Sequence, residues 1–311
     1  MAISRASIAK ELLPGLNAVF GLEYGEVNNE LDPLYESENS DRAFEEEVMF
    51  TGFGTAPVKG EGSAVSYDTA QETYVSRYTN ETVALAFAIT EEAMEDNLYD
   101  TFSKLRARGL ARAMANTKQV KGADVFNNGF STAAAWVGGD GVAFCSASHP
   151  TVSGVNQSNL MAASDLSEAA LETALTSIQK IKDDRNILIG ASAESLHIPP
   201  DLWATADQIL HSPGTTTAGG TGDGNYAQNS INAVRHMGMV PDGFFVNRRF
   251  TNTNDYFIKT DVPNGAKMFN RVPLQTKMEP DFDTGNLRFK ARERYSFGFS
   301  DWRGYFGSAG S

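Results

Sequence analysis

The sequence predicts an α+β protein, because its strongest strand signals and its strongest helix signal lie in separate stretches of the chain. Residues 45–89 are rich in β-branched and aromatic side chains with glycine-containing breaks, which is typical of strands. Residues 90–122 keep apolar side chains at helical spacing with no proline among them. Residues 287–299 alternate between basic and apolar side chains, which indicates a long final strand. Between these stretches, shorter helices alternate with short strands in a module that is either α/β or α+β.

The acidic charge of the chain is concentrated near its N-terminus. The formal net charge is −13 at pH 7, and between Glu23 and Glu47 ten acidic residues stand against one basic residue, Arg42. Proteins that wrap nucleic acid need a basic face, so the charge argues against that class. We expect the acidic, sparsely apolar segment from Glu23 to Phe44 to be an arm that needs a partner surface. Before it, residues 8–20 have helical spacing interrupted by a proline, which predicts one or two short helical turns.

Residues 45–80 predict a β-hairpin with a glycine-rich tip. They contain no Leu, Ile or Trp, and Lys59-Gly60-Glu61-Gly62-Ser63 is the expected tip. A hairpin of this size is marginal in water unless it lies on another surface. Two interpretations stay open: the hairpin packs on its own domain, or it awaits a neighbour.

The next strand and the long helix are predicted from their periodicity. Large apolar side chains from Val83 to Ile89 alternate with alanines, and we expect this strand to be central in its sheet. Thr90 is the expected N-cap of a rod of roughly 45 Å that ends towards Gly122. Its apolar stripe is Met94, Leu98, Phe102, Leu105, Leu110, Ala113 and Met114.

The middle of the chain contains shorter predicted elements. A loop at 136–141 marks a boundary. The elements expected after it are a helix from Asp165 through Ile181 with Glu168 in a capping box, strands at 187–189 and 195–198, a helix opened by Pro199-Pro200, a flexible loop at 212–224, and strands at 244–246 and 256–258.

A ladder of four basic residues lies in the final predicted strand. They occupy alternate positions and point to one face, about 7 Å apart. Nucleic-acid contact is disfavoured by the net charge, and a solvated face with intrachain partners is the simpler alternative. We favour contact with acidic residues, either within the chain or on a neighbouring copy. The ladder is Arg288, Lys290, Arg292 and Arg294, and the acidic candidates are Glu45, Glu46 and Glu47.

Few residues could support catalysis. The single cysteine, Cys145, and His149 supply only two of the ligands that a metal site needs. The same pair could serve a soluble hydrolase, but no orienting acid is evident nearby in sequence. Glycines near residue 220 lack the Gly-Lys-Ser/Thr ending of a phosphate loop. We therefore predict no enzyme, and no catalytic, cofactor or metal site.

Cysteine usage and hydropathy bear on the compartment. One cysteine cannot form an intramolecular disulfide and suits a reducing environment. No apolar run resembles a secretory signal or a membrane span, so we expect no membrane contact and synthesis in the cytoplasm.

The order of these elements resembles that of tailed-bacteriophage major capsid proteins of the Hong Kong 97 type. Three passages strengthen the resemblance: Ser148-His149-Pro150 followed by Gly154 and Asn156, the passage LHIPPDLWATADQIL, and the ending Asp301-Trp302-Arg303-Gly304-Tyr305-Phe306-Gly307-Ser308. The resemblance implies an N-terminal arm (1–44), an extended loop (45–80), a peripheral domain (81–136 and 267–299), an axial domain (137–266) and a C-terminal tail (300–311).

The resemblance also implies a function. Copies would form hexamers and pentamers of an icosahedral head that encloses double-stranded DNA without sequence-specific binding, within the virion and assembled in host cytoplasm. A separate scaffolding protein, a portal and a decoration protein are the implied partners, and an encapsulin-like nanocompartment shell is the alternative. Some relatives crosslink subunits through a lysine in the extended loop, but no asparagine partner for Lys59 stands out. The candidate inter-subunit contacts are Glu45, Glu46, Glu47, Lys59, Glu61, Arg288, Lys290, Arg292 and Arg294.

Overall fold

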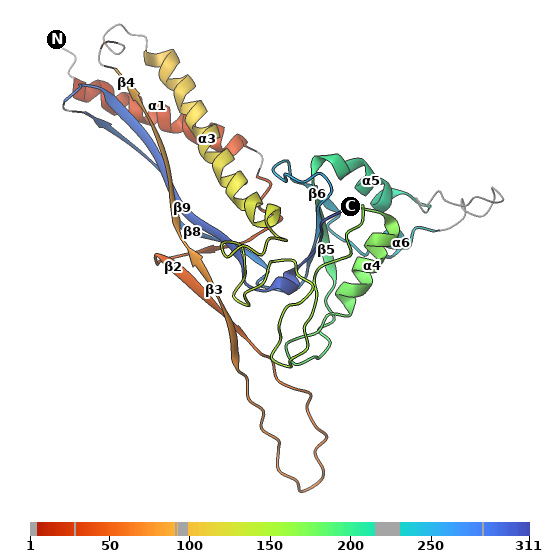
Figure 1. Cartoon of the computed structure of the whole chain (residues 1–311). Helices are drawn as coiled ribbons and strands as arrows, with labels where there is room; N and C mark the ends of the chain where they lie inside the picture. Colours follow the sequence, from red (N-terminus) through yellow and green to blue (C-terminus); the bar gives the residue numbers. More distant parts are fainter. Residues whose placement is uncertain (1–4, 28, 91, 93–98, 215–230, 282) are drawn as a thin grey trace.

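The computed structural model describes residues 5–27, 29–90, 92, 99–214, 231–281 and 283–311. Two four-stranded sheets and a two-stranded hairpin make up its β-structure (Figure 1). The long sheet has the strand order β1-β8-β9-β4, the short sheet has the order β10-β7-β5-β6, and β2 pairs with β3. The strands are β1 Glu36–Asn39, β2 Phe44–Phe50, β3 Glu72–Thr79, β4 Glu81–Ile89, β5 Ala193–Ile198, β6 Phe244–Val246, β7 Tyr256–Thr260, β8 Ala266–Pro280, β9 Leu287–Phe299 and β10 Tyr305–Ser308.

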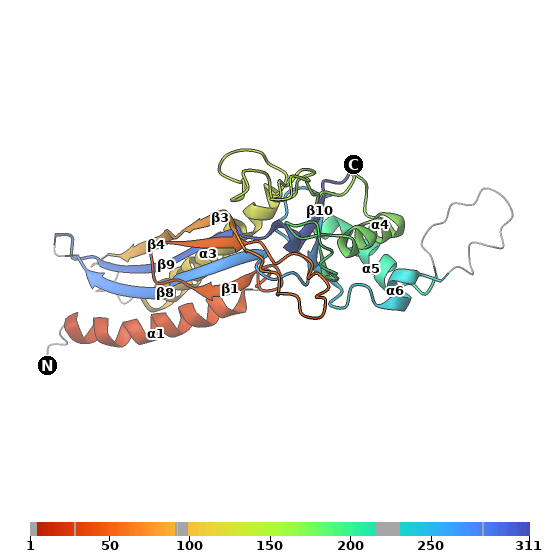
Figure 2. The ribbon, with the colours of Figure 1, turned by 90° about the horizontal axis from the view of Figure 1, so that it is seen from below.

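Two long helices cover one face of the long sheet (Figure 2). They are α1 (Arg5–Glu26) and α3 (Tyr99–Asn127). Phe20 of α1, Met114 of α3 and Phe289 of β9 are buried in one hydrophobic cluster. The helices are therefore fastened to the sheet by a shared apolar layer.

The final strand has the predicted two-faced pattern. In β9 the side chains at 287, 289, 291, 293 and 295 are buried, whereas those at 288, 290 and 292 are exposed. The prediction that the basic ladder points to one face is confirmed, and that face is the one without helices.

The prediction that the strand from Val83 to Ile89 is central is wrong. Among the described residues β4 pairs with β9 alone, so it forms an edge of the long sheet. Val83 and Phe87 do pack on the helix-covered face, as the alternation predicts. The periodicity of a sequence indicates which face of a strand is buried, but not whether a second strand pairs with its other edge.

Both long helices exceed their predicted bounds. α1 continues through Pro14 as one helix of 22 residues, because its later half packs against α3 and the sheet. α3 continues five residues past Gly122, which the sequence suggests as its end. A Cβ at Gly122 would lie 2.5 Å from the side chain of Leu31. The glycine therefore leaves room for Leu31 of the arm to pack against α3, and it does not end the helix. Residues 91 and 93–98, which include most of the predicted first turn, lie outside the described part, and Leu105 is exposed rather than packed.

The short sheet carries the smaller helices α4 (Glu168–Gln179), α5 (Trp203–His211) and α6 (Ala233–Met237), and 3₁₀ turns lie at Pro200–Leu202 and Trp302–Gly304. The helix opened by Pro199-Pro200 and the predicted strands at 195–198, 244–246 and 256–258 are present. Ser167, rather than Asp165, caps α4. Most of the predicted flexible loop, residues 215–230, lies outside the described part.

The predicted strand at 187–189 is wrong. Only an isolated bridge joins Leu188 to Lys182. The carboxylate of Asp183 accepts hydrogen bonds from the backbone amides of Arg185 and Ile187, at 2.9 and 2.8 Å. This local turn satisfies backbone groups that a strand would have placed in a sheet.

The hairpin is built from shorter strands than the sequence suggests. Between β2 and β3 lies loop segment 51–71, which projects away from both sheets (Figure 1). Its tip turns at the predicted place, where Ser63 donates its backbone amide to the carbonyl of Gly60 at 3.2 Å. Gly62 has a φ of 76°, which glycine adopts without strain.

Candidate assembly surfaces

Loop segment 51–71 holds large apolar side chains in solvent. Val58 is 100% exposed and Tyr67 is 98% exposed, and Phe53 and Val65 are mostly exposed. Several apolar side chains on one projecting segment are typical of an interaction surface. Lys59 and Glu61 lie beside them, exposed at the tip, as the sequence predicts.

The base of this segment is fastened by Arg185. Its guanidinium lies 2.6 Å from the carboxylate of Asp68 and also donates to the carbonyl of Thr69. Asp68 accepts the backbone amide of Gly54 at 2.6 Å, so one carboxylate joins the two sides of the loop segment. Hydrogen bonds from Arg185 and the backbone lower the pKa of Asp68 to about 2.

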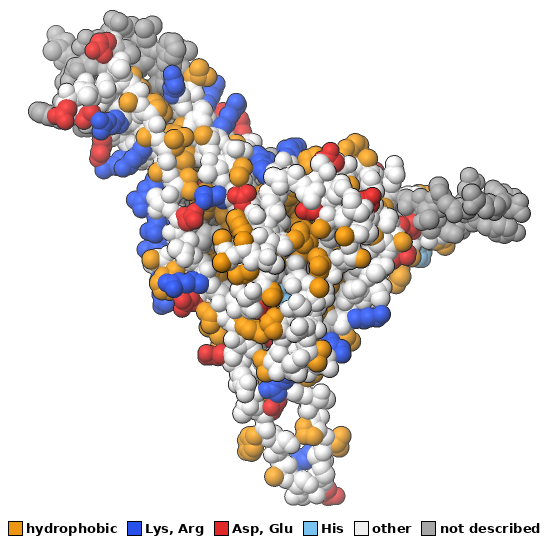
Figure 3. Space-filling view, viewed as in Figure 1, with side chains coloured by type: hydrophobic (Ala, Val, Ile, Leu, Met, Phe, Trp, Pro, Cys, Tyr) orange, Lys and Arg blue, Asp and Glu red, His pale blue; other side chains and the backbone are white. Residues whose placement is uncertain are grey.

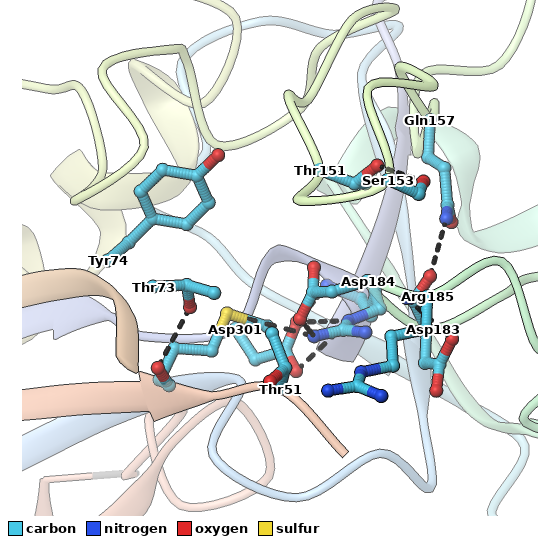
Figure 4. A network of polar contacts seen from close by, with 12 residues as sticks. Thr51, Thr73, Tyr74, Thr151, Ser153, Gln157, Asp183, Asp184, Arg185 and Asp301 are labelled. Carbon is cyan, nitrogen blue, oxygen red and sulfur yellow. Dashed lines mark hydrogen bonds and ion pairs between the residues drawn. The ribbon is translucent and has the colours of Figure 1, made fainter. Parts of the chain in front are cut away.

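A buried arginine, Arg303, connects the hairpin to the C-terminal segment, and its partners Asp184 and Asp301 are labelled in Figure 4. Arg303 donates to Asp301 at 2.9 Å and lies 3.5 Å from Asp184. It also approaches the sulfur of Met49, in β2, at 3.7 Å. Burial raises the pKa of Asp184, although the charge of Arg303 opposes this. The network sets the position of the hairpin relative to the short sheet.

A buried lysine fastens the other side of the hairpin. Lys267, in β8, is 3% exposed and lies 2.8 Å from Glu38 of β1 and 2.5 Å from Glu47 of β2. Ser300 donates to the same Glu47 carboxylate. Burial opposes the charge on Lys267, but the hydrogen bonds to the two glutamates outweigh it and raise its pKa. The arm, the hairpin and the long sheet are therefore joined through the ammonium group of Lys267.

The acidic candidates of the hairpin have partners other than the basic ladder. Glu45 accepts the hydroxyl of Ser40 at 2.8 Å, and Glu46 lies 3.7 Å from Arg77. Glu47 is held by Lys267. The within-chain version of the proposed contact is therefore wrong for the described residues, because Glu46 and Glu47 lie next to Arg77 and Lys267 and Glu45 binds the hydroxyl of Ser40.

The basic ladder forms an open face. Arg288 pairs with Asp281, but in the described part of the chain no hydrogen bond or ion pair reaches the side chains of Lys290, Arg292 or Arg294. The Nε atom of Arg294 is buried without a partner. Lysines and arginines gather along this side of the molecule (Figure 3).

The strands beside the ladder leave it uncovered. In β4 the residues opposite the ladder are small, and Ala86 faces Lys290 while Ala84 faces Arg292. On the other side Lys277 of β8 lies opposite Lys290, but its charge is paired with Glu279, which lies opposite Arg288. Apart from this pair at its edge, the described face is basic and uncovered, and could meet a partner.

Cys145 and His149 do not form a nucleophile pair. Cys145 is 2% exposed, and burial raises the pKa of its thiol. Sequence reasoning missed an orienting acid: Asp140 lies 2.6 Å from Nδ1 of His149. The other ring nitrogen lies 3.0 Å from Asn159, so both nitrogens are used away from the thiol. The hydrolase interpretation is therefore not supported.

Other chemistry is sparse in the described residues. They include no cluster of three or more histidine, cysteine or acidic side chains able to hold a metal ion. Within the same residues, no helix combines the length and hydropathy needed to span a membrane.

Sequence reasoning missed Arg185, Lys267 and Arg303 as positioning residues. Arg303 lies in the C-terminal passage that carries the family resemblance, so that motif was a signal for it. Nothing in the sequence near Lys267 distinguishes it from the chain's other lysines, because its partners come from β1 and β2. The contact of Arg185 with Asp68 likewise spans 117 residues.

Three solved structures share this fold over most of the chain. The virus-like particle from Pyrococcus furiosus is 10% identical with a TM-score of 0.52, covering 95% of this chain and 98% of that chain. The capsid of a native GTA particle is 13% identical with a TM-score of 0.52, covering 90% of each chain. The capsid of cyanophage P-SCSP1u is 9% identical with a TM-score of 0.53, covering 89% of this chain and 86% of that chain. Identities this low establish the fold alone.

Comparison at the level of sequence families is more specific. No curated protein matches the chain. A profile of the family described as phage capsid protein matches residues 73–306, which is well over half of the chain and includes the long helix, the short sheet and the basic ladder. The chain therefore belongs to the phage capsid protein family, has the Hong Kong 97-type fold, and is a structural protein of the virion shell.

Proposed function

We propose that this chain is the major capsid subunit, which assembles into the hexamers and pentamers of an icosahedral head that encloses double-stranded DNA. The observation that carries the proposal is the projecting loop segment 51–71, whose apolar side chains would stay in water in a monomer. In this proposal the arm (1–44) and the extended loop (45–80) flank a peripheral domain built on the long sheet. The short sheet belongs to an axial domain.

Neighbouring copies would meet through the extended loop and the basic ladder. The ladder is basic, and the hairpin strand β2 offers an exposed Glu46 on one face and a half-buried Glu45 on the other, so either carboxylate could face a neighbour's ladder. Opposite charges on two surfaces of one chain favour contact between copies, because they steer association and fix register. Lys59 and Glu61 at the tip would lie on the adjacent subunit.

Other partners follow from this role. A separate scaffolding protein would guide shell closure, and a portal and a decoration protein would join the finished head in the host cytoplasm. The DNA inside would be held by enclosure, since the chain carries a net charge of −13. We do not expect covalent crosslinks through Lys59.

A nanocompartment shell is the second candidate. The observation that favours it is the likeness to a virus-like particle across 95% of this chain. The two candidates differ in contents, because one shell would hold packaged DNA and the other would hold cargo protein.

Electron microscopy of the purified chain, alone and with a co-expressed scaffolding protein, tests the proposal. Closed shells or rings of five and six copies are expected. A chain that stays monomeric in both preparations at high concentration would contradict assembly. Nucleic-acid and protein analysis of particles from infected cells then separates head from nanocompartment.

A further inference from the structure

A groove lies where β3 and β9 diverge. β4 pairs with β9 only as far as Glu81, which lies opposite Tyr295. There the chain passes from β3 into β4, so β3 leaves the long sheet while β9 continues toward the short sheet (Figure 1). The fork holds a groove of about 320 Å³, which joins a second groove of about 140 Å³ through the shared lining residues Val125, Trp136 and Phe297. The assembly surfaces described above do not include this groove.

The edge of β3 that faces the groove has unpaired backbone groups. The amide of Asn80 donates to the carbonyl of Ala43 at 3.1 Å, which makes these residues a hydrogen-bonded pair of the β2–β3 ladder. In an antiparallel ladder such pairs alternate with pairs whose backbone groups point outward. By this alternation Val75, Arg77 and Thr79 direct their N–H and C=O groups away from β2, toward the groove that they line. Within the described residues, no backbone hydrogen bond reaches these groups.

The opposite wall of the groove is a second unpaired edge. The amide of Ser300 donates to the carbonyl of Gly265 at 3.0 Å, so the outward-pointing residues of β9 near its end are Phe297 and Phe299. β4 ends before it reaches them, and no other described strand pairs with this edge. Two strand edges with free donors and acceptors therefore face one groove. Extended chain is the ligand that such edges bind.

Two glycines close one end of the fork. A Cβ at Gly139 would lie 2.6 Å from the carbonyl oxygen of Val75, and a Cβ at Gly138 would lie 2.6 Å from the ring of Phe299. The loop that carries them therefore fills the space between the strands at that end. The other half of each edge stays open, and its residues are Arg77, Thr79 and Phe297.

Residues 64–67 of loop segment 51–71 have the properties of a strand without a partner. Val65 and Tyr67, 65% and 98% exposed, alternate with smaller side chains. This stretch contains no proline or glycine, whereas Pro57 on the other side of the loop lacks an N–H group. In the described part of the chain its backbone makes no hydrogen bond. It can therefore pair with an open edge along its whole length.

The charges at the groove favour an uncharged occupant. Lys121 is paired with Glu81, and Asp124 adds a negative charge beside them. Arg77 is paired with Glu46 at 3.7 Å. An acidic partner of the kind expected at the basic ladder is therefore disfavoured here, whereas residues 64–67 carry no charge.

The loop segment of the same chain cannot reach this groove. It projects from the end of the hairpin that lies away from the long sheet, and Arg185 holds its base there (Figure 1). The eight residues of β3 span roughly 26 Å between this base and Thr79. The chain from residue 71 back to residue 67 spans at most about 14 Å. Residues 64–67 must therefore come from another copy.

We propose that residues 64–67 of a neighbouring copy add as a short strand to the groove between β3 and β9. Val65 and Tyr67 then lie against Val125 and Trp136, and the smaller alternate side chains face outward. The inference rests on the proposed contact between copies through the extended loop, and it names the place and the mode of that contact.

Amide NMR of the unassembled full-length chain tests the proposal without requiring shells. The probe is a peptide with the sequence of residues 62–69. We expect saturable downfield shifts of the amides of Arg77, Thr79 and Phe297, because each N–H group gains an acceptor. The same peptide with Ser66→Pro should bind about tenfold more weakly, since it loses a donor. Equal binding of the two peptides, or shifts confined to the basic ladder or absent at all three amides, would overturn the proposal.

Assembly of chain variants separates this inference from the shell proposal. Ser66→Pro in the loop, or Ala135→Tyr in the groove lining, should leave a folded monomer and greatly reduce closed particles. The matched controls are Thr55→Pro, on the other side of the loop, and Ala134→Tyr, which is exposed and does not line the groove; both should assemble normally. Normal particles from Ser66→Pro and Ala135→Tyr would overturn the groove and leave the shell proposal standing. Absence of particles from wild type, with the peptide shifts present, would do the reverse.

Discussion

The two four-stranded sheets of this molecule differ in how many of their faces the chain itself covers. In the short sheet, nearly every side chain of β5, β7 and β10 is buried, whichever way it points. In the long sheet, β9 buries one face under α1 and α3 and leaves the other bare. The short sheet is thus complete in a single chain, whereas the long sheet has a second face for a partner.

The largest loss of stability is expected from the short sheet. Leu196 of β5 is fully buried, and Leu196→Ala should lower the free energy of unfolding by about 2–5 kcal/mol because it leaves a cavity. Leu85 of β4 is 48% exposed, and Leu85→Ala should cost less than about 1 kcal/mol. Denaturant unfolding of the unassembled chain measures both changes. Leu85 points to the helix-covered face at the edge of the long sheet, so equal losses would mean that this edge is covered as fully as the short sheet.

The junction of the arm, the hairpin and the long sheet should be the next most sensitive. Lys267→Met leaves Glu38 and Glu47 without their shared cation, and we expect a loss of about 1–3 kcal/mol. The pKa of Lys267 in the folded chain lies above its ordinary value of 10.5. The stability that this lysine contributes is therefore complete below pH 10.5, and it is lost as the pH rises through the pKa of the folded state. Stability measured from pH 7 upwards should fall more steeply in wild type than in the variant. Adding Glu47→Gln to the variant should recover part of the loss, and no recovery would contradict the charge explanation.

A smaller effect is expected at the base of the extended loop. Asp68→Asn weakens the contact with Arg185, so loop segment 51–71 should be cleaved by protease roughly twofold faster or more, with little change in global unfolding. The pKa of Asp68 is lowered from 3.8 to about 2, so in wild type this contact is present above about pH 4 and is lost as pH falls towards 2. Lys59→Ala at the tip is the control and should leave the cleavage rate unchanged. Equal rates in all three proteins would show that Arg185 does not fasten the loop.

Much of this architecture could be predicted from periodicity, and the errors have a common physical origin. The alternation of apolar residues in β9 and their helical spacing in α5 indicate which side of each element is buried. Both elements could therefore be predicted from the sequence. The edge position of β4 and the close approach of Leu31 to Gly122 depend on distant segments, so periodicity could not report them. The same applies to the candidate contacts: the exposure of the ladder was predictable, whereas the partners of Glu46 and Glu47 were not.

Reversing charge on the bare face should have the smallest effect on the folded chain and the largest on its assembly. Arg292 and Arg294 have no ion-pair partner among the described residues, so Arg292→Glu with Arg294→Glu should change unfolding free energy by less than about 0.5 kcal/mol. If the bare face meets the acidic hairpin of a neighbour, the doubly reversed chain should remain folded and form no closed particles. Adding Glu45→Arg and Glu46→Arg should restore particles, because complementarity is re-established with opposite signs. Sedimentation and electron microscopy separate the outcomes. Normal particles from the doubly reversed chain would show that the bare face of the long sheet contacts only solvent. If the variant with all four substitutions forms no particles, the ladder has a partner other than the hairpin.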